Sequence, residues 1–361
     1  MCEISVSVIV TRICYFLSQL YSYGIIIMNQ GGQDMKYRLL GKTGVKVSEI
    51  SLGTWQLGSI WGMPFDYDKA IETLEIAEKE GVNCFDTADV YIDGVSENTI
   101  GKFKKQRNSN TYVITKVGRK LQPHIASLYN EKNLRKFVDD SRKNLDLDTL
   151  NMVLLHCPPA EVYENNRVFK IMDQLVAEKK VLHYGVSVET ISEALFALTH
   201  PNVSAIEIIF NMFRLKPAEK LFEKAKEKNV GLIIRVSLAS GLLTGKYHEK
   251  TSFNPNDHRT YNRHGEAFDK GETFSGVDYH LGLKAVTELK KLFGTDNLVP
   301  YALRWILMFD AVSTVIPGAS NPKQIEMNVK ASELPPLTKK QMDGVKHIYD
   351  TYIKSSVHHL W

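Results

Sequence analysis

Short apolar runs alternate with amphipathic helical stretches along most of the chain, and no other feature constrains its fold as strongly. Each run is apolar on both faces, which is typical of buried parallel strands covered by helices. About eight such strand-then-helix units are expected between residues 48 and 332. The runs expected to form strands are 49–55, 82–86, 111–118, 150–156, 182–188, 205–213, 231–238 and 313–319.

Two α/β architectures have this alternation of strands and helices. A doubly wound sheet with a dinucleotide site would carry a Gly-x-Gly-x-x-Gly turn after its first strand, and the sequence has none there. An eightfold barrel needs eight units and about 250 residues, which the region from residue 48 to 332 supplies. The sequence therefore predicts a (β/α)8 TIM barrel.

The residues before the first unit divide into two parts. Residues 36–48 have the pattern of a β-hairpin with Gly41 and Gly44 in its turn, expected to cap the bottom of the barrel. Residues 1–34 are apolar and aromatic, yet they fit neither a signal peptide nor a spanning helix of about 20 apolar residues. Two interpretations stay open: translation that starts at Met28 or Met35, or a membrane-associating extension. The predicted domains are an N-terminal extension over 1–34 and a barrel over 35–361, with no stable membrane span.

Charge and cysteine usage exclude several classes of partner. The formal net charge is only +4, and Lys and Arg alternate with acids, so no nucleic-acid partner is expected. The four cysteines have no disulfide or metal spacing, which favours a reducing compartment and a cytoplasmic location. The oligomeric state is not indicated by the sequence.

Polar side chains stand at the ends of three consecutive predicted strands, where the active sites of eightfold barrels lie. Asp86 ends the second strand and Tyr91 follows it, Lys116 lies near the end of the third, and His156 ends the fourth. Alternatives are that the acids cap the next helix, that Tyr91 packs, and that His156 is a hydrogen-bonded core residue. Ser96 is the expected N-cap of that helix. A buried Lys is costly unless it is paired, and Asp86 is the nearest expected partner.

Together the four groups make chemical sense. An ammonium beside a phenol lowers the pKa of the phenol, so Lys116 would help Tyr91 to donate a proton, while Asp86 keeps Lys116 charged. A neutral His156 would donate a hydrogen bond to the same acceptor oxygen. This arrangement suits hydride addition to an aldehyde or ketone, and it needs no metal.

The motifs of the chain resemble those of the aldo-keto reductase superfamily, in order and at matching intervals, over residues 36–350. The resemblance implies an NADPH-dependent carbonyl reductase with a catalytic tetrad of Asp86, Tyr91, Lys116 and His156, in which Tyr91 is the general acid in reduction. The segments "RLLGKTG" and "LASGLLTGKY" are similar to a bacterial branch that includes potassium-channel β-subunit-like members. The motifs that carry the resemblance are "YRLLGKTGVKVSEISLGTW", "FDTADVY", "ITK", "LLH", "GVS", "IIFN", "LASGLLTGK" and "IPGASNPKQIEMNV".

The resemblance also implies a binding site for the nicotinamide end of the cofactor. Ser187 matches a ligand of the carboxamide, and Phe210 matches an aromatic residue that stacks on the nicotinamide ring. Glu207 stands where the family usually has Gln, and a carboxylate cannot donate to the carboxamide oxygen. Either Glu207 is protonated, or the carboxamide of the cofactor is turned over, or the affinity for the cofactor drops. The alternative is that Glu207 forms a local salt bridge instead of binding the cofactor. The remaining cofactor contacts expected near the first strand are Gly53, Thr54 and Trp55.

The phosphate-binding residues follow from two later motifs. The loop after the seventh strand is expected to cover the pyrophosphate, and the loop and helix after the eighth strand to hold the adenosine 2′-phosphate. Ser320 and Asn321 are neutral where many relatives place Arg or Lys, and Lys323 is the nearest cation. NADP(H) is therefore the expected cofactor, with NAD(H) also possible. The expected ligands are Leu238, Ser240, Gly241, Leu242 and Lys246 in the first loop, and Gly318, Ser320, Gln324 and Asn328 in the second.

Two other functions are compatible with the same barrel. One is a regulatory subunit that binds the nucleotide as a sensor, and the other is a hydrolase or lyase that uses a metal, against which Lys116 beside Asp86 and His156 argues. The partner expected for an enzyme is a small carbonyl compound, whose identity the sequence does not give. The residues expected to build its pocket are Trp55, Trp61, Phe65, the loop after His156 and the C-terminal segment.

Overall fold

The computed structural model describes residues 35–59 and 63–361. The described residues from Met35 onward belong to one compact unit. The N-terminal segment 1–34 and Trp61 lie outside the described residues, so the two interpretations of that segment and the boundary at residue 35 stay predictions. Within the described part, no helix is both long and apolar enough to cross a membrane.

Eight parallel strands form the central sheet in the order β3 to β10, which is also their order along the chain. Two further parallel bridges, Ile50 to Val315 and Gly53 to Gly318, join the first strand to the last and close the sheet. The predicted eightfold barrel is thus confirmed. The strands are β3 Leu52–Gly53, β4 Cys84–Asp86, β5 Tyr112–Val117, β6 Leu150–His156, β7 Val181–Ser187, β8 Val203–Ile209, β9 Gly231–Arg235 and β10 Val312–Val315.

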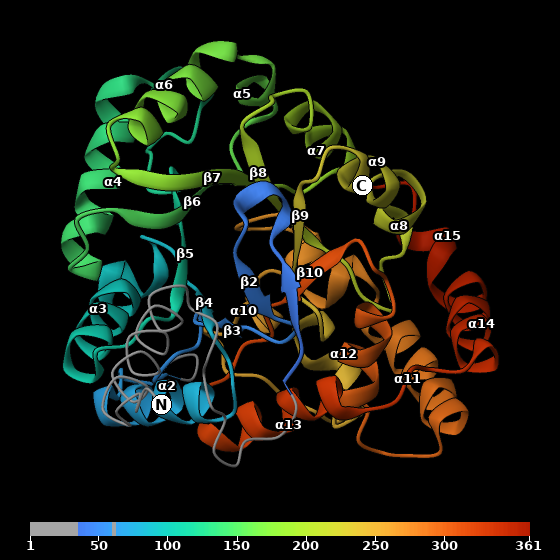
Figure 1. Cartoon of the computed structure of the whole chain (residues 1–361). Coiled ribbons are helices and arrows are strands. Elements are labelled where there is room, and N and C mark those ends of the chain that lie inside the picture. The colour runs from blue at the N-terminus through green and yellow to red at the C-terminus, as the bar shows by residue number, and fades with distance from the viewer. Residues whose placement is uncertain (1–34, 60–62) are drawn as a thin grey trace, which may run out of the picture. The chain divides into compact units, whose positions relative to one another are not determined.

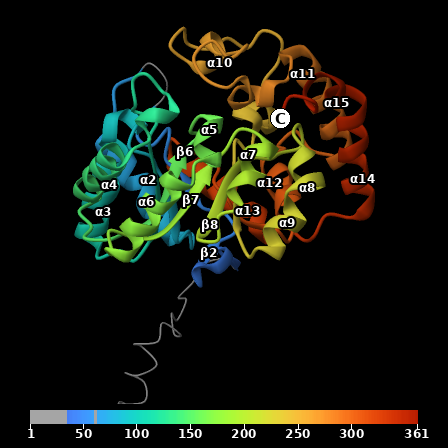
Figure 2. The ribbon, with the colours of Figure 1, turned by 90° about the horizontal axis from the view of Figure 1, so that it is seen from above.

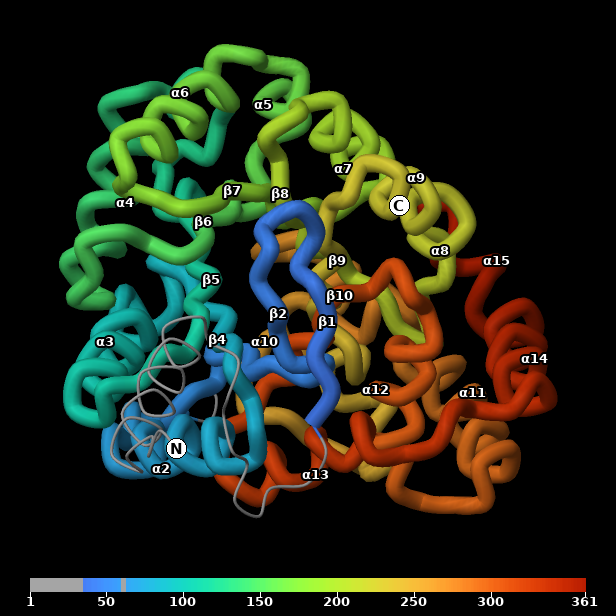
Figure 3. The backbone as a smooth tube through the Cα atoms, in the orientation of Figure 1, coloured from blue at the N-terminus to red at the C-terminus, as the bar shows by residue number. Residues whose placement is uncertain are grey.

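Helices follow the strands and cover the outer face of the sheet, as the ribbon in Figure 1 and the backbone tube in Figure 3 show. Their apolar sides pack on the strands; in α4 the buried positions include Leu134, Val138 and Leu145, one helical turn or two apart. The helices are α2 Tyr67–Lys79, α3 Val95–Arg107, α4 Glu131–Leu145, α5 Ala160–Glu164, α6 Asn166–Ala177, α7 Ile191–Ala197, α8 Lys216–Lys220, α9 Phe222–Glu227, α10 His258–Tyr261, α11 Tyr279–Phe293, α12 Val299–Leu307, α13 Pro322–Glu333, α14 Lys339–Ile348 and α15 Lys354–Val357.

The predicted hairpin is formed by β1 (Tyr37–Leu39) and β2 (Lys46–Ser48) and closes the end of the barrel from which the strands start. Its Leu40 is fully buried and packs with inward-facing residues of the strands, among them Ile114, Leu154 and Ile233. Figure 2 shows β2 at one end of the barrel and α10 at the other. The opposite end, where the strands finish, is therefore the one available for a site.

The start of α3 differs from the prediction. Ser96 is not the N-cap, because the helix begins at Val95 and Gly94, in the left-handed region at φ 86°, stands at the cap position. The Ser96 hydroxyl instead donates to Thr54 Oγ1 at 2.9 Å, and it lies 2.9 Å from Thr87 Oγ1. Ser96 therefore ties this helix to the ends of β3 and β4 rather than capping it.

Gly185 lies where β7 and β8 pack closely against each other. A Cβ at this position would lie well inside van der Waals contact of the Ala205 carbonyl oxygen and 2.9 Å from Leu154 Cδ2. We expect Gly185→Ala to lower the free energy of unfolding by about 1–3 kcal/mol, because an added methyl group must push the strands apart. Urea unfolding of the purified variant measures this. Gly318→Ala is the matched control, since its Cβ would meet nothing closer than 3.9 Å; an equal loss in both variants would contradict the packing argument.

Candidate active site

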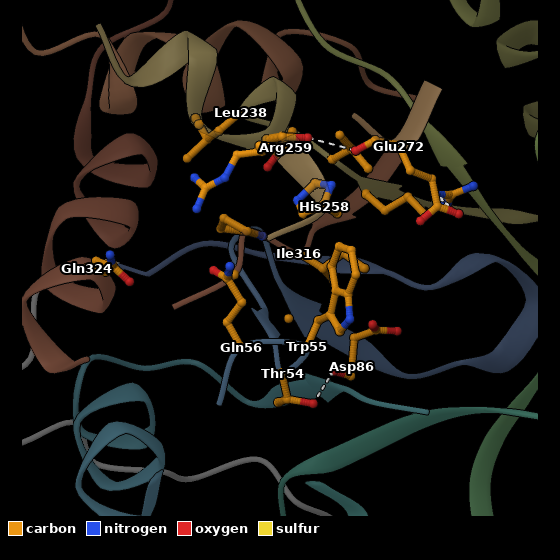
Figure 4. A pocket seen from close by; sticks show the side chains of 18 of the residues that line it. Thr54, Trp55, Gln56, Asp86, Leu238, His258, Arg259, Glu272, Ile316 and Gln324 are labelled. Carbon is orange, nitrogen blue, oxygen red and sulfur yellow. Dashed lines mark hydrogen bonds and ion pairs between the residues drawn. The ribbon is translucent and has the colours of Figure 1, made fainter. Parts of the chain in front are cut away.

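A cavity of about 520 Å³ opens at the end of the barrel where the strands finish. This volume lies within the range of sites for small molecules and cofactors. Figure 4 shows Trp55 and Asp86 on one wall, Leu238 and Arg259 on the facing wall, and Gln324 at one end. Strands β3, β4, β6, β8 and β9 and the loops after them supply most of the lining residues.

Lys116 lies behind this cavity and is completely buried. Its Nζ is 2.5 Å from Asp86 Oδ1 and donates to the Thr87 carbonyl oxygen at 3.1 Å and to Tyr91 Oη at 3.2 Å. Strands β4 and β5 are neighbours in parallel register, which places Asp86 and Lys116 at the same end of the sheet. The predicted pairing of Lys116 with Asp86 is present, and it brings the ammonium against the tyrosine.

Tyr91 is placed by a tight turn rather than by a strand. It begins a short 3-10 turn, Tyr91–Gly94, in which Ile92 and Asp93 have φ near +50°. Such angles are strained for a β-branched residue, so this turn is held by its surroundings. The Tyr91 ring stacks on Trp55 with centroids 6.4 Å apart and meets His156 edge-on at 6.1 Å. Tyr91 and His156 therefore face the same part of the cavity.

The charge states at the site follow from burial. Burial lowers the pKa of His156 well below its usual value, with Arg119 and Lys116 adding to the effect, so its imidazole is neutral at pH 7. Lys116 is desolvated, but Asp86 and Glu207 outweigh this effect and raise its pKa well above its usual value. The net pKa of Tyr91 is raised by burial, although Lys116 lowers it. The expected influence of Lys116 on Tyr91 is present but smaller than desolvation.

Three charged residues at the cavity were not predicted. Arg235 ends β9, and its Nη2 is 2.8 Å from Glu189 Oε2, while Nη1 is 3.5 Å from Glu272 Oε1. Arg119 follows β5 and reaches the same Glu272 oxygen at 3.4 Å. Arg119, Arg235 and Glu272 all line the cavity. An arginine inside the apolar run "GLIIRVSL" is the same signal that identified Lys116, and it could have revealed Arg235.

Most residues predicted to bind the cofactor line the cavity. They come mainly from the loops after β3 and β10 and from the loop after β9, and the closed sheet brings these segments together. Lys116 does not line the cavity, but its ammonium contacts Asp86 and Tyr91 on the cavity wall. The predicted residues that line the cavity are Gly53, Thr54, Trp55, Asp86, Tyr91, His156, Glu207, Leu238, Ser240, Gly241, Lys246, Gly318, Gln324 and Asn328.

Phe210 is the clear exception. It is completely buried away from the cavity, where its ring stacks on Trp305 with centroids 5.0 Å apart and meets Phe222 and Phe309 edge-on. The geometry is that of an aromatic core under α9 and α12, so the predicted stacking of Phe210 on a ligand ring is wrong. A ring in this packed cluster cannot also face the cavity.

Three other predicted residues lie beside the cavity but not on its wall. Ser187 is buried and its hydroxyl donates to Glu207 Oε1 at 3.3 Å. Leu242 packs in the core against Gly282, and the backbone N–H of Ser320 donates to Gln324 Oε1 at 2.7 Å. Among the expected substrate-pocket residues that the structure describes, only Trp55 is on the cavity wall. The C-terminal Trp361 is held elsewhere, because its Nε1 donates to Asp269 and its ring lies under Arg214.

Comparison with known proteins decides the family. The model of the aldo/keto reductase family matches residues 49–350. The chain belongs to the aldo-keto reductase family. Aldo-keto reductase YhdN from Bacillus subtilis is 30% identical to it over 300 residues, which cover 81% of this chain and 87% of that protein. A probable voltage-gated potassium channel subunit beta from Arabidopsis thaliana is 30% identical over 322 residues, covering 84% of this chain and 93% of that protein.

Solved aldo-keto reductase structures share the barrel. The glycerol dehydrogenase AKR11B4 from Gluconobacter oxydans superposes with a TM-score of 0.72 at 25% identity, covering 88% of this chain and 96% of that one. The holo form of AKR11C1 from Bacillus halodurans gives 0.70 at 24% identity, covering 87% and 96%. This aldo-keto reductase is accordingly an oxidoreductase by family, and the resemblance inferred from its motifs is confirmed.

One group of possible metal ligands occurs in the described part of this aldo-keto reductase. Cys157, Glu189 and Glu272 place one ligand atom each within 4.8 Å of the others. Arg235 already lies among them, with Nη2 2.8 Å from Glu189 and 3.6 Å from Cys157 Sγ. A guanidinium in the middle of the group repels a cation, so the cluster fits an internal ion-pair network better than a metal site.

Asp89 is the acid of the Tyr91 loop to which the motif assigns no role. Its side chain is buried, and neither carboxyl oxygen accepts a well-formed hydrogen bond from the described residues. Burial together with Glu97 raises its pKa to about 7, although Lys120 and the Val90 N–H oppose this. A carboxyl whose pKa is raised in the folded state stabilises that state at low pH, and the effect is lost as the pH rises through 7.

Asp89→Asn should remove this pH dependence in the aldo-keto reductase. Relative to the wild type, the free energy of unfolding of Asp89→Asn should rise by roughly 2–3 kcal/mol between pH 5 and pH 8. Urea unfolding of both proteins at the two pH values gives the difference. Asp93→Asn is the control in the same turn, because Asp93 is almost fully exposed. Parallel pH dependence in wild type and Asp89→Asn would show that Asp89 is ionised at both pH values.

Proposed function

We propose that this aldo-keto reductase reduces an aldehyde or ketone to an alcohol with NADPH, and that Tyr91 donates the proton. The observation that supports this most directly is the contact of the buried Lys116 ammonium with Asp86 on one side and Tyr91 Oη on the other, at 2.5 and 3.2 Å. Neutral His156 faces the same space. A carbonyl oxygen placed between Tyr91 and His156 would meet two hydrogen-bond donors.

The cavity fits a dinucleotide on two structural grounds. Glu207 Oε2 and Ser237 Oγ are buried on residues of its wall and have no hydrogen-bond partner among the described residues, as expected for groups that await a polar ligand. The second ground is that α13 begins at the end of the cavity marked by Gln324, where the positive end of the helix dipole favours a phosphate.

The chain's own residues then have separate tasks. NADPH supplies the hydride when it is bound. As the substrate oxygen gains negative charge, Tyr91 gives it the phenolic proton, and the adjacent Lys116 stabilises the phenolate that remains. Asp86 holds Lys116 in place and charged, and the imidazole of His156 orients the oxygen by a hydrogen bond. No step needs a metal ion.

Tyr91→Phe tests the proton donor. We expect the turnover of a reactive aldehyde to fall by roughly 10²- to 10⁴-fold, because the general acid is lost, while NADPH still binds with nearly unchanged affinity. Loss of NADPH absorbance measures turnover, and quenching of tryptophan fluorescence measures binding. Tyr261→Phe serves as control, since Tyr261 lines the same cavity and no contact with Lys116 is seen for it. Full activity in Tyr91→Phe would refute the assignment.

We expect the first turn of α13 to set the preference between NADPH and NADH. Lys323 is exposed at the first turn of α13 and is the cation expected to meet a 2′-phosphate. Lys323→Ala should weaken NADPH binding by about 2- to 5-fold, the effect of one exposed charge pair, and leave NADH binding unchanged. Titrations with NADPH and NADH in parallel give the two affinities. Lys330→Ala, at the other end of α13, is the control; equal losses for both nucleotides would exclude a 2′-phosphate contact.

A second candidate function is regulation by nucleotide binding. It is favoured by the relatives named as probable or putative voltage-gated potassium channel subunits beta from Arabidopsis thaliana and Schizosaccharomyces pombe, each 30% identical to this chain. A panel of aldehydes and ketones distinguishes the two functions, because a sensor binds NADPH but turns over every carbonyl only slowly. The cytoplasmic location expected from the cysteines stays a prediction.

A further inference from the structure

Glu207 brings a second carboxyl group to Lys116, besides Asp86. Its Oε2 is 3.5 Å from Lys116 Nζ, which already lies 2.5 Å from Asp86 Oδ1. Asp86 comes from β4 and Glu207 from β8, and both are at most 2% exposed. Asp86 Oδ2 and Glu207 Oε2 have no hydrogen-bond partner among the described residues. One buried ammonium therefore serves two carboxyl groups, and each of them keeps one oxygen without a hydrogen bond among the described residues.

The other nearby cation, Arg235, is shared with two further carboxyl groups. Arg235 Nε is 3.9 Å from Glu207 Oε1, but its Nη2 and Nη1 are engaged by Glu189 and Glu272. Ser187 donates a single neutral hydrogen bond to Glu207. Two buried carboxylates that share one ammonium leave a net negative charge in a medium of low dielectric constant, which is costly.

A shared proton removes this cost. Burial and the neighbouring Glu207 raise the pKa of Asp86 well above its usual value, although Lys116 opposes them. The titratable and charged groups that face the pair from the packed elements are Cys84, Tyr91, Lys116, His156 and Arg235.

We propose that Asp86 and Glu207 hold one proton between them beside Lys116, and that loss of this proton is what slows carbonyl reduction at high pH. The second half of this proposal rests on the proposed function. With the proton present, the charges of Asp86, Glu207 and Lys116 sum to zero. Without it they sum to −1, and this extra negative charge opposes the charge that develops on the substrate oxygen and on Tyr91. Glu207 is thus a positioning residue, which acts through Lys116.

Infrared spectroscopy of the protein without ligands tests the shared proton directly. A protonated carboxyl group has a carbonyl-stretching band separate from that of carboxylates. At pH 7 we expect this band in the wild type and the loss of one component in Glu207→Gln. Glu49→Gln is the control, because Glu49 is equally buried but paired with Arg38 at 2.7 Å, and it should leave the band unchanged. Two further components are expected from Asp89 and Glu189, whose pKa values burial raises to about 7, and Asp89→Asn and Glu189→Gln identify them.

The pH profile of reduction tests the functional half. Turnover at saturating aldehyde and NADPH is measured from pH 6 to 10 and normalised to its value at pH 7. We expect the wild-type rate to decline at alkaline pH and the decline in Glu207→Gln to begin about one unit higher, because its charge sum stays at zero. Identical normalised profiles would assign the decline to Tyr91 and overturn this half of the proposal.

The two measurements separate the possible failures. A wild-type spectrum without any protonated carboxyl band at pH 7 overturns the shared proton, and this result needs no variant. A wild type that reduces no carbonyl compound contradicts the proposed function, and the infrared band still decides the protonation of the pair. If Glu207→Gln does not fold, the pH at which the wild-type band disappears must match the wild-type kinetic decline, and a mismatch overturns the link between them.

Discussion

The ammonium of Lys116 is the interaction on which the site depends. A fully buried Lys is tolerated only where anionic and polar partners replace water, and here Asp86, the Thr87 carbonyl and Tyr91 surround it. Satisfying Lys116 therefore fixes the end of β4, the end of β5 and the turn that carries Tyr91. The strained φ angles in that turn are maintained because moving Tyr91 away would leave the ammonium less well solvated.

The closed parallel sheet explains why residues so distant in sequence meet. Each strand runs in the same direction, so its carboxyl end delivers a side chain to one rim, and the bridges between Ile50 and Val315 and between Gly53 and Gly318 bring the first and last strands together. The hairpin covers the other rim with Leu40. The ionisable side chains of Asp86, Lys116, His156 and Glu207 are consequently gathered at one end of the interior.

The sequence predicts this arrangement well wherever a local pattern has one structural outcome. The apolar runs require buried parallel strands, and an ionisable residue at the end of such a run, as at Asp86, Lys116 and His156, must face the rim. It predicts poorly where the position of a side chain depends on which distant segments of the chain pack against it. Phe210 ends an apolar run too, but helices α9 and α12 offer it an aromatic cluster, and this contact is invisible in its own segment. Ser96 likewise bonds to Thr54, which precedes it by many residues, instead of capping its helix.

The charged network around Arg235 holds the loop between β9 and α11 to the barrel rim in the same way, through buried ion pairs. Glu272 of that loop meets Arg119 and Arg235, while Asp269 of the same loop accepts a hydrogen bond from the C-terminal Trp361. Removing any one of these partners would leave a poorly solvated charge, so the loop and the barrel rim stabilise each other. The consequence for chemistry is that the electrostatic potential at the rim is set jointly by Arg119 and Arg235 and by Glu189, Glu207 and Glu272. The protonation of one carboxyl therefore affects the free energy of charge at Lys116 and, through it, at Tyr91.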